Sequence, residues 1–186
     1  MCPPNSWWST LGVCNRERMG KPTTWSTPAR VRRTHDEGML VGGYLRWPLV
    51  RLLELGPNPA APACARLYTK TVLAAWGLPR DTIVDAETCV SETITNALRA
   101  TLALGELLPI GLRLLANTER LVTEAWDCHP GVPVVRPVTL DDEGGRGLAV
   151  IEAYSNRWGV RRLSPRVKAV WCELLVPPIR PGGTGW

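Results

Sequence analysis

The chain has 186 residues, a net charge of +5, nine Trp and no Phe. This length fits one domain with a modest extension, and the Leu-, Ala-, Arg-, Gly- and Pro-rich composition is that of a globular protein. Composition leaves the catalytic class open.

The basic charge is concentrated near the N-terminus. Residues 1–46 contain seven of the 22 basic residues and three of the 17 acidic ones, which leaves 15 basic and 14 acidic residues, a net charge of +1, for the remainder. The nearly neutral remainder does not favour nucleic acid as the partner of the folded domain. A nucleic-acid-associated protein that uses Arg30, Arg32 and Arg33 is the alternative, and its binding would depend strongly on salt.

The cysteine and hydropathy patterns argue against several classes of protein. The six Cys residues form no Cys-x-x-Cys pair, and only His35 and His129 could add imidazole ligands, so we expect no zinc site. This cysteine usage fits a reducing cytoplasm. No run of about 18 apolar residues and no N-terminal signal pattern occurs, so we expect a cytoplasmic protein that does not interact with a membrane.

The first segment differs in composition from the rest. Residues 1–46 are rich in Pro, Ser, Thr, Arg and Trp and lack the periodicity of a strand or a helix. We expect a disordered or non-native basic leader, with Met39 as an alternative start.

The first predicted elements are a strand and a helix. Alternation of apolar residues over 49–55 predicts an edge strand, because Pro48 directly precedes it. Residues 60–76 predict a helix that ends at Gly77. Its expected core-facing residues are Ala65, Leu67, Val72, Leu73 and Trp76.

A long amphipathic helix is predicted for residues 81–104. Its apolar stripe consists of Ile83, Ala86, Val90, Ile94, Ala97 and Leu98. Glu92 and Asn96 lie four residues apart on the opposite face, so a carboxylate and an amide are presented together. The alternative is an ordinary solvated helix face.

The second half predicts mainly strands. Residues 110–115 and 121–126 form a hairpin pattern. A long Pro- and Gly-rich loop covers 127–147 and is expected to be functional or disordered. A helix over 148–154 and closing strands at 158–161 and 168–175 follow, and the tail over 177–186 is expected to be flexible.

The order of these elements predicts an α+β fold. Strand, helix, helix, strand, strand, loop, helix, strand, strand indicates a two-layer sandwich with helices on one face of a mainly antiparallel sheet.

Two further clusters could act together with Glu92 and Asn96. Asp127 directly follows a hydrophobic strand; it is either a turn-forming residue or, at a pocket rim, an acceptor for an exocyclic amine such as that of adenine. The second cluster, residues 144–147, leads into a predicted helix. Its glycine backbone could lie close to phosphates, or the cluster is simply a flexible turn. Its residues are Gly144, Gly145, Arg146 and Gly147.

Five motifs in this order resemble the stand-alone histidine-kinase-like ATPase domains of actinobacteria, relatives of the anti-sigma-factor serine/threonine kinases. The motifs are Ser91–Ala97, Trp126–Asp127, Glu143–Leu148, Arg157–Val160 and Lys168–Leu174. The resemblance covers residues 47–176 and implies the Bergerat ATP-binding fold.

The resemblance also implies ligands and residue roles. ATP and Mg²⁺ would be the cofactors, with Glu92 as the catalytic base or orienting group and Asn96 as the magnesium ligand. Asp127 would contact adenine, and the glycines of the 144–147 cluster would lie beside the phosphates. Arg146 could add a contact to a phosphate or be solvated.

The implied activity is phosphorylation of a serine or threonine of a partner protein. The implied partners are a sigma factor or an antagonist of the anti-anti-sigma type, and a homodimer is one alternative for the oligomeric state. Cys128-His129-Pro130 replaces the Gly-x-Gly that follows the aspartate in better-known kinases of the superfamily. The competing hypothesis is a non-catalytic module in which ATP switches a protein-interaction surface.

Overall fold

The structure, a computed structural model, describes residues 25–26, 47–105, 107–131 and 147–177. Its elements in chain order are β1 (Trp25–Ser26), β2 (Leu49–Leu55), α2 (Ala61–Ala75), α3 (Arg80–Ala103), β3 (Ile110–Ala116), β4 (Arg120–Asp127), α4 (Gly147–Tyr154), β5 (Arg157–Ser164) and β6 (Val167–Leu175).

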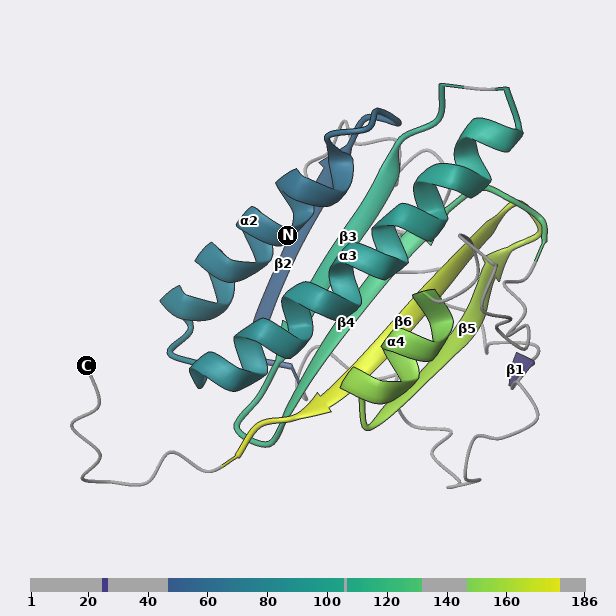
Figure 1. The fold of residues 1–186 in the computed structure, drawn as a ribbon. Helices are drawn as coiled ribbons and strands as arrows, with labels where there is room; N and C mark the ends of the chain where they lie inside the picture. The colour runs from purple at the N-terminus through teal and green to yellow at the C-terminus, as the bar shows by residue number, and fades with distance from the viewer. Residues whose placement is uncertain (1–24, 27–46, 106, 132–146, 178–186) are drawn as a thin grey trace, which may run out of the picture.

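The strands form one six-stranded sheet with the order β1-β5-β6-β4-β3-β2. All five strand pairs are antiparallel. Figure 1 shows α2, α3 and α4 on the same face of this sheet. The predicted two-layer α+β sandwich with a mainly antiparallel sheet is therefore confirmed.

The predicted edge strand and first helix are confirmed, with one error in the helix. β2 has the predicted bounds and lies at the edge of the sheet. α2 is followed, as expected, by Gly77, whose positive φ of 75° turns the chain so that the Leu78 N–H bonds the carbonyl of Leu73 at 3.1 Å. Leu67, predicted to face the core, is instead 67% exposed, because the buried side of α2 is centred on Ala65 and Leu73.

The predicted apolar stripe of α3 is buried along its whole length. Its six residues belong to the main hydrophobic core, between α3 and the strands. α3 contacts α2 and α4 on its two sides and β4 and β6 beneath it (Figure 1). Burial of this stripe fixes the rotation of α3 about its axis and so decides where its polar side chains lie.

The β3–β4 hairpin is confirmed as well. Asn117 closes the turn, because its Oδ1 accepts hydrogen bonds from the N–H groups of Glu119 and Arg120 at 2.9 and 2.8 Å. The two strands are slightly longer than predicted and include Ala116 and Asp127.

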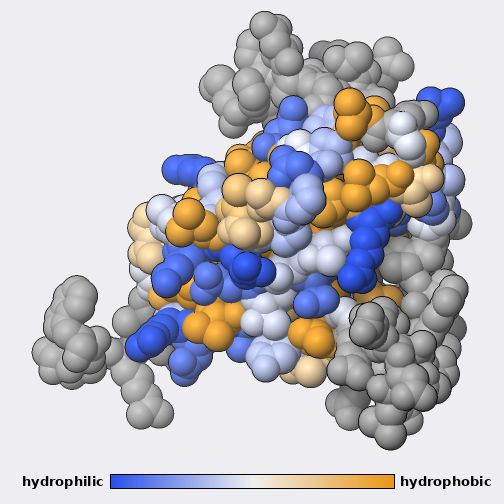
Figure 2. All heavy atoms as spheres, turned by 45° about the horizontal axis from the view of Figure 1, so that its top comes forward, coloured by the Kyte–Doolittle hydropathy of each residue, from blue (hydrophilic) through white to orange (hydrophobic). Residues whose placement is uncertain are grey.

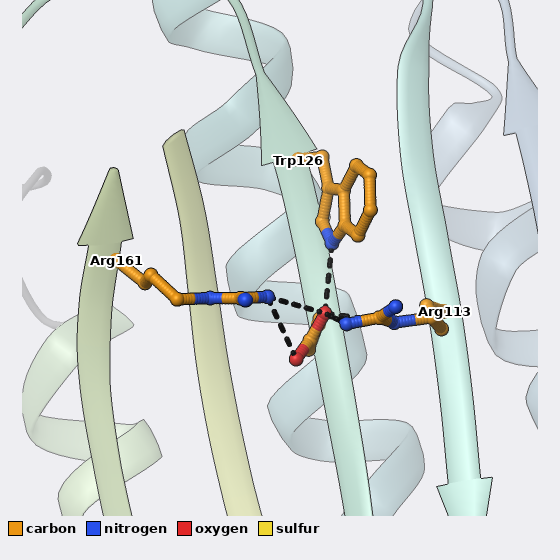
Figure 3. A network of polar contacts seen from close by, with 4 residues as sticks. Arg113, Trp126 and Arg161 are labelled. Carbon is orange, nitrogen blue, oxygen red and sulfur yellow. Dashed lines mark hydrogen bonds and ion pairs between the residues drawn. The ribbon is translucent and has the colours of Figure 1, made fainter. Parts of the chain in front are cut away.

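The sheet face opposite the helices contains a buried ionic cluster that the sequence did not suggest. Arg113 lies between two helix-facing leucines of β3, so its side chain projects from the other face. Figure 3 shows Arg113, Trp126 and Arg161 converging on one carboxylate, that of Glu124. Arg113 Nε and Trp126 Nε1 donate to Glu124 Oε2 at 2.9 and 3.0 Å, and Arg161 Nη2 lies 3.2 Å from Oε1.

Strand register explains how side chains from non-adjacent strands meet. Arg161 of β5 reaches Glu124 of β4 across β6, where Ala169 is the register partner of both Arg161 and Trp126. The Arg113 guanidinium also lies 4.9 Å from the centre of the Trp126 ring, within the range of a cation–π contact.

The surroundings of Glu124 keep its carboxyl ionised. Burial raises the pKa of Glu124, but the guanidiniums of Arg113 and Arg161 and the hydrogen bonds from Arg113 and Trp126 outweigh burial and leave this pKa below its usual value. The resulting stability is present above the unfolded-state pKa and is lost as the pH falls through the lower folded-state pKa.

The described surface carries apolar side chains from several elements. The large exposed ones are Leu67, Val84, Leu102, Leu107, Tyr154 and Leu175. In the view of Figure 2, apolar atoms alternate with hydrophilic ones. None of the described helices is both long and apolar enough to cross a membrane.

Part of the predicted organisation lies outside the described residues. Within the predicted leader, the structure describes only Trp25–Ser26, which pairs with β5 at the edge of the sheet. Residues 132–146 and 178–186 are likewise outside the description. The domain boundaries at 46/47 and 176/177 therefore stay predictions.

Replacing Glu124 by Gln should lower the free energy of unfolding by about 3–5 kcal/mol, because two buried guanidiniums lose their counter-charge. Urea unfolding at neutral pH measures the change. Glu119→Gln, in the exposed β3–β4 turn, is the matched control and should change the free energy by less than about 0.5 kcal/mol. Equal stability of the two variants would contradict a structural role for the cluster.

Candidate functional site

Glu92 and Asn96 lie side by side on α3 and face the first residue of α4. A Cβ atom at Gly147 would lie 2.7 Å from Glu92 Oε2 and 3.3 Å from Asn96 Nδ2. An added Cβ would have to displace the Glu92 carboxylate, a shift that costs little because Oε2 is the far end of a flexible side chain. The structure thus brings together the predicted Glu92–Asn96 pair and the last glycine of the predicted loop.

The packing of α4 explains this close approach. Leu148 and Ile151, three residues apart on one side of α4, are buried against the core. They hold the short helix against α3. The N–H groups in the first turn of a helix have no intrahelical acceptor and favour negative charge nearby. The start of α4 therefore offers hydrogen-bond donors beside a carboxylate and an amide.

Asp127 is the last residue of β4 and is almost fully buried, at 1% exposure. Its Oδ1 accepts hydrogen bonds from Lys168 Nζ at 2.5 Å and from the backbone N–H of His129 at 2.8 Å. Lys168 Nζ also donates to the carbonyl oxygen of His129 at 3.0 Å. Asp127 is therefore more than a turn-forming residue, because it is half of a buried ion pair.

Burial controls the protonation of Asp127. Burial raises the pKa of its carboxyl, and the Lys168 ammonium and the His129 N–H oppose that rise without cancelling it. The pKa of Asp127 therefore lies above its usual value, opposite in direction to that of Glu124. A perturbed carboxyl at the end of a strand is a common property of functional sites.

Lys168 is the site residue that the sequence interpretation missed. The sequence places it in a closing strand and in the last of the five motifs but gives it no role in the site, and 41 residues separate it from Asp127. The register of β4 and β6 places the two residues directly opposite each other. One signal was present in the sequence: Lys168 alternates with Val170, Cys172 and Leu174, so it occupies an inward-facing position where an unpaired charge would be costly.

The other predicted site residues fall into two groups, those outside the described part of the chain and those on α3. Gly144, Gly145 and Arg146 lie outside the described residues. Glu92 and Asn96 are half-buried, so they are neither a fully solvated face nor part of the core. The roles assigned to the site residues stay predictions.

Comparison with known proteins agrees with this architecture. Residues 56–173 match the model of the histidine kinase-like ATPase domain. No curated protein sequence matches the chain. Among solved structures, the RsbU and RsbW domains of Rv1364c from Mycobacterium tuberculosis are similar, with a TM-score of 0.53 and 19% identity over 71% of this chain. The match spans 33% of that chain, and at this identity it shows the fold alone.

The close approach of Gly147 to Glu92 predicts a measurable coupling. Gly147→Ala should force the Glu92 side chain aside, and Glu92→Ala in the same chain should remove that cost. Because Glu92 Oε2 is the far end of a flexible side chain, a double-mutant cycle in urea unfolding should give a coupling energy at the lower end of the range for contacting residues, about 0.5–1 kcal/mol.

The matched control pairs Gly147→Ala with Glu119→Ala in the distant β3–β4 turn. Those two changes should be additive within about 0.5 kcal/mol. Additivity in the Gly147–Glu92 cycle as well would show that Glu92 moves aside at no cost, so that its carboxylate is not held beside Gly147.

Proposed function

The chain belongs to the family of histidine kinase-like ATPase domains, and from this premise we propose that it binds ATP with Mg²⁺ and transfers phosphate to a serine or threonine of a partner protein. Membership of an ATPase-domain family implies a nucleotide site. The observation that carries the assignment of that site is the meeting of Glu92, Asn96 and Gly147 at the start of α4.

The proposed nucleotide site lies between α3 and α4. Its support is that Gly147, at the start of α4, comes close to the side chains of Glu92 and Asn96. In the proposal, the Asn96 amide oxygen is the protein ligand of Mg²⁺, an ion that prefers few protein oxygens together with phosphates and waters. The first N–H groups of α4, with the glycines at 144 and 145 and Arg146, would bind phosphate oxygens.

Asp127 would bind the base at the other end of the site. An ionised carboxylate is only an acceptor, so it suits the exocyclic amine of adenine. The buried position of Asp127 at the end of β4 supports this role, because hydrogen bonds to charged groups are stronger where water is excluded.

Glu92 would act on the hydroxyl that is phosphorylated. Its carboxylate is adjacent to Asn96 and could accept the hydroxyl proton or orient the hydroxyl for attack. Bound Mg²⁺ supplies charge neutralisation on the phosphate oxygens, so the protein needs mainly to position the groups. Replacing Glu92 should therefore affect transfer more than binding.

The proposed partner is a regulatory protein, either a sigma factor or its anti-anti-sigma-type antagonist. The motif resemblance to anti-sigma-factor kinases supports this choice. The alternative, an ATP-dependent switch without catalysis, would use the same nucleotide site and differ only in the role of Glu92.

Calorimetric titration with ATP and Mg²⁺ tests the nucleotide site. Asp127→Asn should weaken ATP binding by about tenfold or more, because it replaces a charged acceptor in a buried hydrogen bond. Asn96→Ala should weaken binding in Mg²⁺ and have little effect in EDTA. Asp81→Asn, exposed in the first turn of α3, is the control and should bind as the wild type does. Unchanged affinity in both site variants would remove the assignment.

Transfer of label from γ-labelled ATP to purified candidate partners tests the kinase activity. Glu92→Gln should retain ATP affinity and lower the transfer rate by about 100-fold or more. If the wild type binds ATP fully but transfers no label to any candidate, the kinase proposal fails and the switch alternative is favoured. The switch also predicts that Glu92→Gln leaves ATP-dependent partner binding intact.

A further inference from the structure

The ion pair between Asp127 and Lys168 has the geometry of a positioning device. Both side chains are almost fully buried, at 1% and 3% exposure, and their strands place them opposite each other. Lys168 Nζ joins two points of the chain, Asp127 Oδ1 at 2.5 Å and the His129 carbonyl oxygen at 3.0 Å. The ammonium therefore fixes both the carboxylate and the backbone that leaves β4.

All the described hydrogen bonds to the Asp127 side chain use the same oxygen. Lys168 Nζ and the His129 N–H both donate to Oδ1. Two donors on one oxygen restrict rotation of the carboxylate about its terminal bond. A carboxylate held in this way presents its second oxygen in one direction, as a binding subsite requires.

The charge of Asp127 decides which base it can recognise. An ionised carboxylate accepts a hydrogen bond from an exocyclic amine, whereas a protonated carboxyl can donate one to an exocyclic carbonyl. Burial favours the protonated form, and Lys168 is the strongest opposing influence. Loss of Lys168 would therefore change the hydrogen-bonding character of the subsite as well as its geometry.

We propose that Lys168 is the positioning residue that gives the Asp127 subsite its selectivity for a purine with an exocyclic amine over one with a carbonyl at the same position. The inference rests on the proposed function, in which Asp127 receives adenine. Lys168 acts through Asp127, by orienting its carboxylate and keeping it ionised.

Other groups near Asp127 cannot replace Lys168 in this role. His129, directly after β4, is the other titratable group that acts on Asp127, and its Nδ1 accepts a hydrogen bond from the Gly131 N–H at 2.9 Å. Arg162 of β5 donates to the carbonyl oxygen of Pro130. α3, which packs on β4, carries Glu92 and the exposed Arg99 in its C-terminal half. Among these groups, Lys168 alone pairs directly with the carboxylate.

Calorimetric titration of the full chain with ATP and with inosine triphosphate, each with Mg²⁺ and over a series of pH values, tests the proposal. The ratio of the affinities for ATP and inosine triphosphate, in which protonation of the shared triphosphate cancels, should fall as the pH drops through the pKa of Asp127. In Lys168→Met that pKa rises further, so the fall should occur at higher pH. The preference for ATP over inosine triphosphate should also decrease by about tenfold, the value of a hydrogen bond to a charged group.

The variants separate charge, geometry and folding. Lys168→Arg keeps the positive charge, so it should restore most of the preference for ATP and the pH at which that preference falls. Lys70→Met, an exposed lysine of α2, is the matched control and should leave both unchanged. If Lys168→Met does not fold, Asp127→Asn with Lys168→Met removes both charges; it should fold and bind ATP with little preference over inosine triphosphate at any pH.

Two results would overturn the inference. One is a preference for ATP in folded Lys168→Met that has the wild-type size and pH dependence, and the other is a preference that still falls at low pH in the double variant. If the wild type binds neither nucleotide, the proposed function fails and this inference fails with it. If the wild type binds ATP with the same preference as Lys168→Met, only the inference fails.

Discussion

Packing of α3 against the central strands β4 and β6 is the constraint on which the candidate site depends. The buried stripe of α3 has one orientation that removes its apolar side chains from water. A rotation by a single residue, about 100°, would turn a polar residue into the core and expose an apolar one. The stripe therefore determines that Glu92 and Asn96 face α4, although neither residue belongs to the core.

The strand order supplies the second half of the site. β6 lies between β4 and β5 in the sheet. After β4 ends at Asp127, the chain therefore forms α4, then β5 on the far side of β6, and finally β6 itself. This path places α4 beside α3 and puts Lys168 opposite Asp127. Residues far apart in sequence meet because an antiparallel strand is inserted between two others.

Local sequence patterns predicted the helices and strands well, but they did not predict which residues from distant parts of the sequence pair with each other. Alternation over residues 49–55 and the 3.6-residue period of α3 are set by burial of one face, which a sequence records directly. Leu67 was wrongly assigned because helix α2 has apolar residues on more than one side, and periodicity does not tell which side is covered. Lys168 was missed because its partner is determined by strand register, which no short window contains.

The charged cluster around Glu124 was missed for a related reason. Arginine and glutamate in strands are usually taken as solvent-facing residues, and only the meeting of three strands reveals that they neutralise one another. Glu173 repeats the arrangement, with Arg120 and Arg157 at 3.3 and 3.8 Å.

Two of the buried carboxylates, Glu124 and Asp127, lie on opposite faces of the sheet and differ in how their partners balance burial. Glu124 has two guanidiniums and an indole N–H, which outweigh burial and lower its pKa. Asp127 has one ammonium and one backbone N–H, which do not outweigh burial, so its pKa is raised. A buried carboxylate whose ionic and hydrogen-bond partners outweigh the cost of burial stays charged and stabilises the fold. One whose partners do not outweigh that cost becomes ionised more readily when a further hydrogen-bond donor binds beside it. This difference in partner number, rather than burial itself, distinguishes Asp127, the proposed site of ligand recognition, from Glu124, whose ion pairs stabilise the fold.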